Sequence, residues 1–145
     1  SEKEEIKHVI QFFEDNPHFE VLGSEVRVFS KKYVVAGTVD LMLRNIKDNK
    51  VYLLDWKTSS KEIECEKHWE MARGLLSEIP HNKYHNYSMQ LSVYTKILKE
   101  TYNIDVQDTM LVHLRDNRTY RLIEPVDLFV YAEIVLATML GVSKT

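Results

Sequence analysis

Residues 33–43, Tyr-Val-Val-Ala-Gly-Thr-Val-Asp-Leu-Met-Leu, and residues 51–57, Val-Tyr-Leu-Leu-Asp-Trp-Lys, are the two stretches that decide the fold. Both are apolar at odd and at even positions, which is typical of β-strands buried on both faces. An unpaired charge in such a strand costs roughly several kcal/mol. The charges of Asp40, Asp55 and Lys57 therefore need a reason, and a bound divalent cation is the best one.

Two carboxylates and a lysine on neighbouring strands describe a site that binds a metal and a phosphate. Side chains alternate between the two faces of a strand, so we expect Asp55 and Lys57 on one face and Trp56 on the other. Carboxylate oxygens, with water in the remaining positions, suit Mg²⁺ or Mn²⁺. Two roles stay open for Lys57: it orients or deprotonates the attacking water, or it stabilises negative charge on the phosphorus oxygens.

Two short motifs carry a family resemblance. Gly37-Thr-Val-Asp40 and Asp55-Trp-Lys57 resemble the G-x-x-D and D-x-K of the PD-(D/E)xK nuclease superfamily. Gln90-Leu-Ser-Val-Tyr94, on a later predicted helix, is similar to the Q-x-x-x-Y of its RecB-like branch, which includes exonuclease-like domains of phages, large DNA viruses and mitochondria. Each motif is weak alone, but their order, spacing and placement on strand, strand and helix are specific together. The resemblance covers the chain from about Glu25 to Tyr102.

The resemblance implies a divalent-metal-dependent nuclease that cleaves DNA, as a RecB-like exonuclease acting in replication, recombination or repair. Asp40 and Asp55 would bind Mg²⁺ or Mn²⁺, and the main-chain carbonyl of Trp56 would supply a third ligand. The partner would be single-stranded DNA or duplex ends. Polarity, strandedness and exo- against endonucleolytic cleavage stay open. The alternative is a nuclease-fold module that has lost catalysis and serves nucleic-acid binding or assembly.

Three further residues are candidate site residues by the same resemblance. Gln90 and Tyr94 lie one turn apart on one side of the predicted helix and would contact the nucleic-acid backbone. The simpler interpretation is that Tyr94 is a core aromatic and Gln90 a boundary residue. Glu25 matches a glutamate often present on the first strand of the family, and it is either an outer-sphere metal partner or an ion-pair residue.

The family's extra metal-binding histidine is the main departure from the pattern, because it normally lies on a helix before the first strand. His8 is the only histidine of the first predicted helix. The apolar stripe of Ile6, Ile10 and Phe13 predicts that His8 faces solvent. We therefore expect that the histidine-bearing helix lies before Ser1, in a longer protein with further domains, or that this chain lacks the ligand.

A competing metal site is suggested by Cys65-x2-His68-x12-His81-x3-His85, which has the ligand spacing of a zinc finger with one cysteine replaced by histidine. The residues between the two halves predict a plain amphipathic helix in a domain that already has a core. We therefore favour His81 and His85 as polar loop residues near phosphate.

The composition fits one intracellular domain spanning residues 1–145. A single cysteine excludes an internal disulfide and an iron–sulfur cluster of four cysteines within this chain, and it fits a reducing compartment. No apolar run reaches the length of a membrane span. The net charge of −3 argues against nonspecific wrapping of nucleic acid. Basic stretches occur, such as Arg115, Arg118 and Arg121, and a solvated loop or strand edge is the simpler interpretation of each.

The periodicity predicts nine elements in the order α-β-β-β-α-α-β-β-α. The expected helices cover residues 3–15, 62–78 and 86–102 and a last segment capped by Asp127, which reaches about Leu140 and ends at Gly141; the expected strands cover residues 20–29, 33–43, 51–57, 107–114 and 118–124. This order predicts an α/β fold, a three-layer α/β/α sandwich with a central mixed sheet. The restriction-endonuclease-like core of the superfamily is built in this way.

Overall fold

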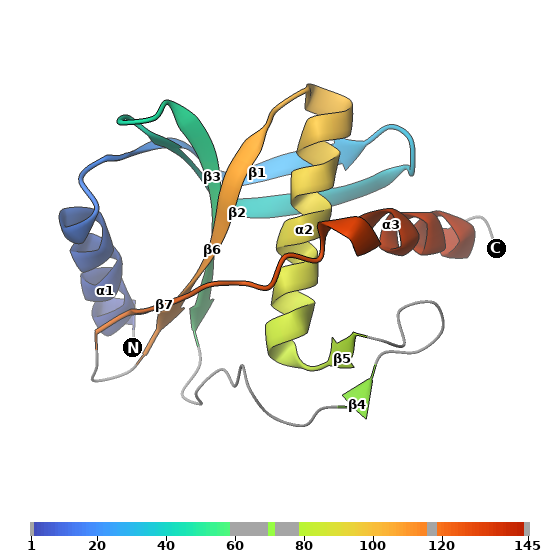
Figure 1. The fold of residues 1–145 in the computed structure, drawn as a ribbon. Coiled ribbons are helices and arrows are strands. Elements are labelled where there is room, and N and C mark those ends of the chain that lie inside the picture. Colours follow the sequence, from blue (N-terminus) through green and yellow to red (C-terminus); the bar gives the residue numbers. More distant parts are fainter. Residues whose placement is uncertain (1, 59–69, 72–78, 116–118, 144–145) are drawn as a thin grey trace. The chain divides into compact units, whose positions relative to one another are not determined.

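A computed structural model of the chain describes residues 2–58, 70–71, 79–115 and 119–143. Within these ranges the chain forms three α-helices, a five-stranded sheet in the order β1-β2-β3-β6-β7 and a two-stranded sheet of β4 and β5 (Figure 1). Their bounds are α1 Glu2–Asp15, β1 Phe19–Ser30, β2 Val35–Asn45, β3 Lys50–Thr58, β4 Glu70–Met71, β5 Pro80–His81, α2 Lys83–Tyr102, β6 Val106–Leu114, β7 Arg121–Ile123 and α3 Phe129–Ser143.

The five-stranded sheet is mixed. β3 runs parallel to β6, whereas β2 is antiparallel to β3 and β6 is antiparallel to β7. The parallel pair is joined by a crossover that contains α2, because parallel neighbours cannot be linked by a tight hairpin. The predicted mixed α/β class is therefore confirmed. None of the described helices is long and apolar enough to cross a membrane.

Several of the predicted elements differ from those observed. Of the helix expected at residues 62–78, the structure describes only residues 70 and 71, and these form β4, which pairs with β5. The rest of that stretch, including Cys65 and His68, lies outside the described residues. The end of the last helix also differs from the prediction: α3 continues to Ser143, so Gly141 does not end the helix.

The chain divides into two compact units, each described by itself. The first unit contains α1, β3, β6 and β7, together with the parts of β1 and β2 up to residue 26 and from residue 39. The second unit contains α2, α3, β4, β5 and residues 27–38, which comprise the end of β1, the turn after it and the beginning of β2.

In the first unit, α1 packs on one face of the sheet through the fully buried ring of Phe12. The centroid of this ring lies 5.5 Å from the rings of both Trp56 and Tyr120, in edge-on geometry. The buried strand residues of the same cluster are Leu41, Leu43, Leu54, Val112 and Leu114. Because side chains alternate along a strand, this cluster also fixes which residues project from the opposite face of the sheet.

The buried side of α1 differs from the prediction. Ile6 and Ile10 are 57% and 52% exposed, whereas His8 is buried and its Nε2 lies 2.6 Å from the carbonyl oxygen of Arg115. The expectation that His8 faces solvent is therefore wrong. Phe12 lies one turn after His8, and the burial of its larger ring turns His8 inward, where the carbonyl meets the hydrogen-bonding need of the imidazole.

The burial of β2 changes along its length. Ala36 and Thr38 are exposed, whereas Val39 and residues 41–43 are buried. The prediction that residues 33–43 are covered on both faces therefore holds only from Val39 onward. Asp40, which is half-buried, lies at the beginning of this covered part.

In the second unit, α2 is capped at both ends by asparagine. The Asn82 side chain accepts a hydrogen bond from the His85 N–H, and Asn103 ends the helix in the left-handed conformation with φ 55°. The cap makes the helix begin three residues before the predicted position. α3 packs against α2 (Figure 1), and the N–H of Leu128 just before α3 donates to the hydroxyl of Ser92, 3.1 Å away.

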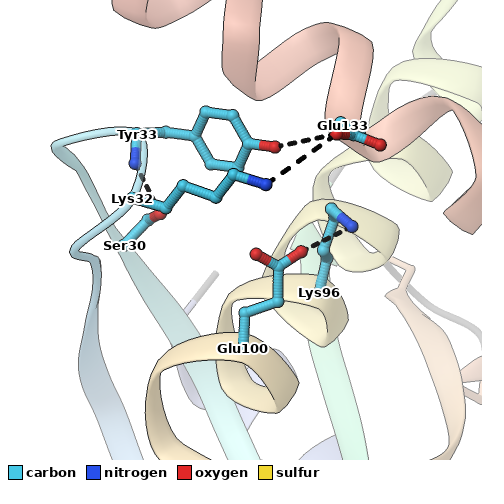
Figure 2. Close-up of polar contacts among 6 residues, drawn as sticks. All are labelled: Ser30, Lys32, Tyr33, Lys96, Glu100 and Glu133. Atoms are coloured by element: carbon cyan, nitrogen blue, oxygen red, sulfur yellow. Dashed lines mark hydrogen bonds and ion pairs between the residues drawn. The ribbon is translucent and has the colours of Figure 1, made fainter.

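The turn between β1 and β2 is attached to both helices of this unit. The Tyr33 hydroxyl donates to Glu133 Oε1 on α3 at 3.3 Å, and Lys32 Nζ lies 3.9 Å from the same oxygen (Figure 2). On α2, the Thr101 hydroxyl accepts a hydrogen bond of 3.4 Å from the Lys31 N–H in the turn, and the Tyr102 hydroxyl accepts one from the Phe29 N–H near the end of β1. Hydrogen bonds and ion pairs thus fix residues 27–38 within their own unit.

Candidate active site

Asp40 and Asp55 meet where the pairing of β2 with β3 ends. The last Cα partners are Leu41 and Leu54, and the same register carried one step further sets Asp40 opposite Asp55. At this point Asp40 Oδ2 accepts a hydrogen bond of 3.1 Å from the main-chain N–H of Trp56. The two carboxylates therefore share one face of the sheet and lie next to each other.

Asp55 and Lys57 project from the face opposite α1. Trp56, between them, contacts Phe12 in the α1 core, so its two neighbours point the other way. Lys57 Nζ lies 2.9 Å from Asp55 Oδ2. The alternation predicted for Asp55, Trp56 and Lys57 is thereby confirmed. The contact between Lys57 and Asp55 is an ion pair within the site.

The electrostatics of Asp55 are unusual for an aspartate. Its side chain is 9% exposed. Burial raises the pKa of Asp55 to about 7, and the carboxyl of Asp40 beside it adds to this rise, against the lowering effect of Lys57. A divalent cation would offset both the lost hydration and the repulsion between the carboxylates. The buried Asp55 carboxylate, with the carboxyl of Asp40 beside it, fits such an ion.

Few other side chains could add to this pair. The described residues contain no group of three or more His, Cys, Asp or Glu side chains that could hold a metal. Glu25 is exposed on β1, at a position with φ 49°, and does not join the pair. His8 contacts the Arg115 carbonyl. Within the part of the chain that the structure describes, the side-chain ligands at this site are therefore Asp40 and Asp55.

Gln90 and Tyr94 lie on α2, in the second unit. Gln90 Nε2 donates to the Tyr94 hydroxyl at 3.1 Å. The ring of Tyr94 lies directly on the main chain of Gly37, because a Cβ built on Gly37 would stand 2.5 Å from Tyr94 Cε1. This close approach explains why glycine begins the Gly37–Asp40 motif. It also joins that motif to the Gln90–Tyr94 motif, a relation that the sequence did not predict.

The zinc-finger spacing can be followed only in part. The side chain of His85 is described, and its Nδ1 lies 3.0 Å from the Asn82 side chain that caps α2. Burial lowers the pKa of His85. His85 thus lies in the first turn of α2 and contacts the helix cap; of the two possibilities for residues 81–85, a loop or a helix entry, the structure supports the helix entry.

Two basic residues near the pair were not recognised as site residues from the sequence. In the parallel register of β3 and β6, His113 is the partner of Lys57, and in the antiparallel register of β6 and β7, Arg121 is the partner of His113. The sequence shows that His113 lies on the same face of its strand as Leu111, because the two residues are two positions apart. It does not show which strand lies next to β6, because that choice depends on the crossover.

Comparisons with known proteins give little. No family model matches this chain, and no curated protein matches it. Among solved structures, the crystal structure of SSO0001 is similar with a TM-score of 0.44 and 20% sequence identity. The alignment covers 97% of this chain and 58% of that chain, so this chain spans little more than half the length of SSO0001. This likeness carries no argument about the site.

Proposed function

We propose that this chain is a divalent-metal-dependent nuclease that hydrolyses phosphodiester bonds in DNA. The observation that carries the proposal is the buried carboxyl of Asp55, which has the carboxyl of Asp40 beside it and Lys57 as its ion-pair partner. Bringing two acids together and desolvating one of them opposes folding unless a ligand offsets the cost. A divalent cation is such a ligand, and together with Lys57 it favours a phosphodiester as substrate.

Asp40 and Asp55 would hold Mg²⁺ or Mn²⁺, with the main-chain carbonyl of Trp56 as a third ligand. The donors are hard oxygens, which both ions prefer. When bound, the ion supplies positive charge for the phosphate oxygens and acidifies the attacking water. The hydrogen bond from the Trp56 N–H holds the Asp40 carboxylate in place for this task.

Lys57 acts as a fixed cation in the proposed reaction. Its side chain is 22% exposed and its ammonium group is held 2.9 Å from Asp55 Oδ2, so it can reach a phosphate oxygen without leaving the site. A water oxygen bonds to phosphorus while the bond from phosphorus to the leaving ester oxygen breaks, and the proton lost by the water ends on the leaving oxygen. Lys57 places the water and stabilises the charge that develops on the phosphorus oxygens.

Gln90 and Tyr94 would position the nucleic-acid backbone. Their mutual hydrogen bond supports this role, because it holds the two polar groups together on one side of α2. The proposed architecture is a three-layer α/β/α sandwich with a restriction-endonuclease-like core. The five-stranded mixed sheet, with helices before, between and after its strands, supports it. The proposed biological role is that of a RecB-like exonuclease in replication, recombination or repair.

A second candidate is a nuclease-fold module that binds nucleic acid with weakened catalysis. One observation favours it: the described residues offer no third side chain to the metal, and His8 is held by the Arg115 carbonyl. The two candidates share the fold and the partner and differ only in turnover.

Hydrolysis assays distinguish the two candidates. Single- and double-stranded DNA and RNA, labelled at the 5′ or the 3′ end, are incubated with the protein and Mg²⁺, Mn²⁺ or chelator. The nuclease proposal expects metal-dependent cleavage of DNA that chelator abolishes, and the product ladders give polarity and strandedness. Cleavage that persists in chelator would refute the metal mechanism. Binding without cleavage under every condition would favour the second candidate.

A further inference from the structure

Three basic side chains form a row across three neighbouring strands of the first unit. Lys57 on β3 is the partner of His113 on β6, and His113 is the partner of Arg121 on β7. Directly paired residues project from the same face, with neighbouring strands about 4.8 Å apart. We call these three residues the basic row. It begins at the candidate active site and ends at β7, the edge strand of the sheet.

The basic row lies on the same face as the two carboxylates. Trp56 and Val112 belong to the α1 core, so Lys57 and His113, which follow them in their strands, project from the opposite face. Asp55 precedes Lys57 by two residues and shares that face, as their ion pair requires. An anion held by a metal ion at Asp40 and Asp55 would therefore have further positive charge beside it, in the direction of β7.

The three members of the row differ in burial. His113 is fully buried, the Lys57 side chain is 22% exposed, and Arg121 is half-buried. His113 therefore packs between the two cations, and Lys57 and Arg121 are the members that a ligand can reach. Their strands are two spacings apart, roughly 10 Å. This distance is on the scale of one or two nucleotides along an extended strand.

We propose that Arg121 binds a backbone phosphate one or two nucleotides from the phosphate that is cleaved. Arg121 is then a substrate-positioning residue of the nuclease, and this inference rests on the proposed function. The planar guanidinium group forms paired hydrogen bonds with phosphate oxygens, which suits this role better than an ammonium group does. The net charge of −3 is compatible with it, since the positive charge is local.

The test compares Arg121→Gln and Arg121→Lys with Lys50→Gln as the matched control. Lys50 is an exposed cation of the same unit, at the opposite end of β3. Cleavage of single-stranded DNA is measured with Mn²⁺, and binding is measured with Ca²⁺ over a range of salt concentrations. Arg121→Gln should raise KM about 10-fold with kcat within about 2-fold, and it should reduce the salt dependence of binding by about one phosphate contact. Arg121→Lys should restore the salt dependence but only part of the affinity, and Lys50→Gln should change neither.

A second measurement uses the unmodified protein, so it does not depend on the stability of a variant. Single phosphates of the DNA are replaced one at a time by uncharged methylphosphonates. One replacement, one or two nucleotides from the cleaved bond, should weaken wild-type binding about as much as Arg121→Gln does, and it should have little further effect in that variant. If every such replacement is neutral, or if Arg121→Gln keeps the wild-type KM and salt dependence, the inference fails while the nuclease proposal stands. If the wild-type protein neither binds nor cleaves DNA, both fail.

Discussion

Each unit contains an ion pair between a carboxylate and a lysine, but one pair is largely buried and the other is exposed. In the first unit, the pair of Asp55 and Lys57 is buried, with the acid 9% exposed and a second carboxyl beside it. In the second unit, Lys32 and Glu133 are 61% and 62% exposed at 3.9 Å, and Tyr33 donates to the same glutamate oxygen (Figure 2). Water screens the exposed pair, which contributes at most about 1 kcal/mol.

The difference favours the buried pair as the one that binds a ligand. The exposed pair is complete as it stands, because its groups keep most of their hydration. In the buried pair, Asp55 has lost most of its hydration and faces a second carboxyl, and both effects raise the pKa of Asp55, to about 7. An arrangement that opposes folding in this way is typical of a functional site.

The largest expected effect is the loss of cleavage when a carboxylate is neutralised. Asp40→Asn and Asp55→Asn should each lower the rate by at least about 10³-fold, because an amide binds Mn²⁺ poorly and the two acids act as a unit. Glu133→Gln, the matched change in the exposed pair, should leave the rate unchanged. Initial rates on end-labelled single-stranded DNA with Mn²⁺ measure this. Rates within about 10-fold of wild type in both aspartate variants would refute the proposed metal site.

The next effect separates chemistry from metal binding. Lys57→Ala should lower kcat by about 10² or more, because the cation that stabilises charge on the phosphorus oxygens is gone. Saturating Mn²⁺ should still raise the melting temperature of this variant, since both carboxylates remain. Lys32→Ala in the exposed pair is the control and should keep wild-type kcat. Wild-type turnover of Lys57→Ala at saturating DNA would show that the lysine has only a structural role.

The third effect concerns a tight contact in the same unit as the exposed pair. A Cβ at Gly37 would stand 2.5 Å from Tyr94 Cε1, so Gly37→Ala must displace the ring. We expect a loss of about 1–3 kcal/mol in the free energy of unfolding, the usual cost of overpacking. In a Tyr94→Ala background the same change should cost less than about 0.5 kcal/mol. Urea unfolding of the four proteins measures the coupling, and additive losses would mean that the contact carries no energy.

Much of the site could be predicted from parity alone. The positions of Asp55 and Lys57 on one face and Trp56 on the other follow from the two-residue period of a strand, which pairing does not alter. The side-by-side position of Asp40 and Asp55 follows from the hairpin, because turn and strand lengths fix its register.

The remaining features depend on packing between distant segments. The direction of His8 was mistaken because Ile6 and Ile10 satisfy a helical stripe, yet the larger Phe12 determines which side is buried. The basic row was missed because the partner of β3 across the parallel pair is chosen by the crossover and not by local sequence. The contact of Tyr94 with Gly37 likewise joins residues far apart in the chain.

The fourth effect is a gain in stability. The pKa of Asp55 is raised in the folded protein to about 7 from 3.8, so the folded state holds the proton more tightly than the unfolded state does. Stability is therefore lost as the pH rises through this interval, and the loss is complete above about pH 7. In chelator at pH 8, Asp55→Asn should be more stable than wild type by about 1–2 kcal/mol. Near pH 3, where the wild-type acid is protonated in both states, the difference should vanish.

Urea unfolding in chelator at the two pH values measures this effect. Glu133→Gln serves as the control and should show no comparable gain at pH 8. A destabilised Asp55→Asn at pH 8 would identify Asp55 as a structural hydrogen-bonding residue, and the argument for a cation would then lose its physical basis.

The smallest expected effect is that of the exposed pair itself. Glu133→Gln removes the charge that faces Lys32, but both side chains are more than half exposed and their atoms lie 3.9 Å apart, so water replaces most of the interaction. The amide oxygen can still accept the hydrogen bond from the Tyr33 hydroxyl, which keeps that buried ring in place. The free energy of unfolding should change by less than about 0.5 kcal/mol, with little dependence on salt, because little charge interaction remains to be screened. Tyr33→Phe removes the same hydrogen bond from the other side and should also cost little, since the 3.3 Å contact is long. A loss above about 1.5 kcal/mol in Glu133→Gln would mean that this pair is as strongly coupled to folding as the buried one, and the contrast between the two regions would no longer identify the functional site.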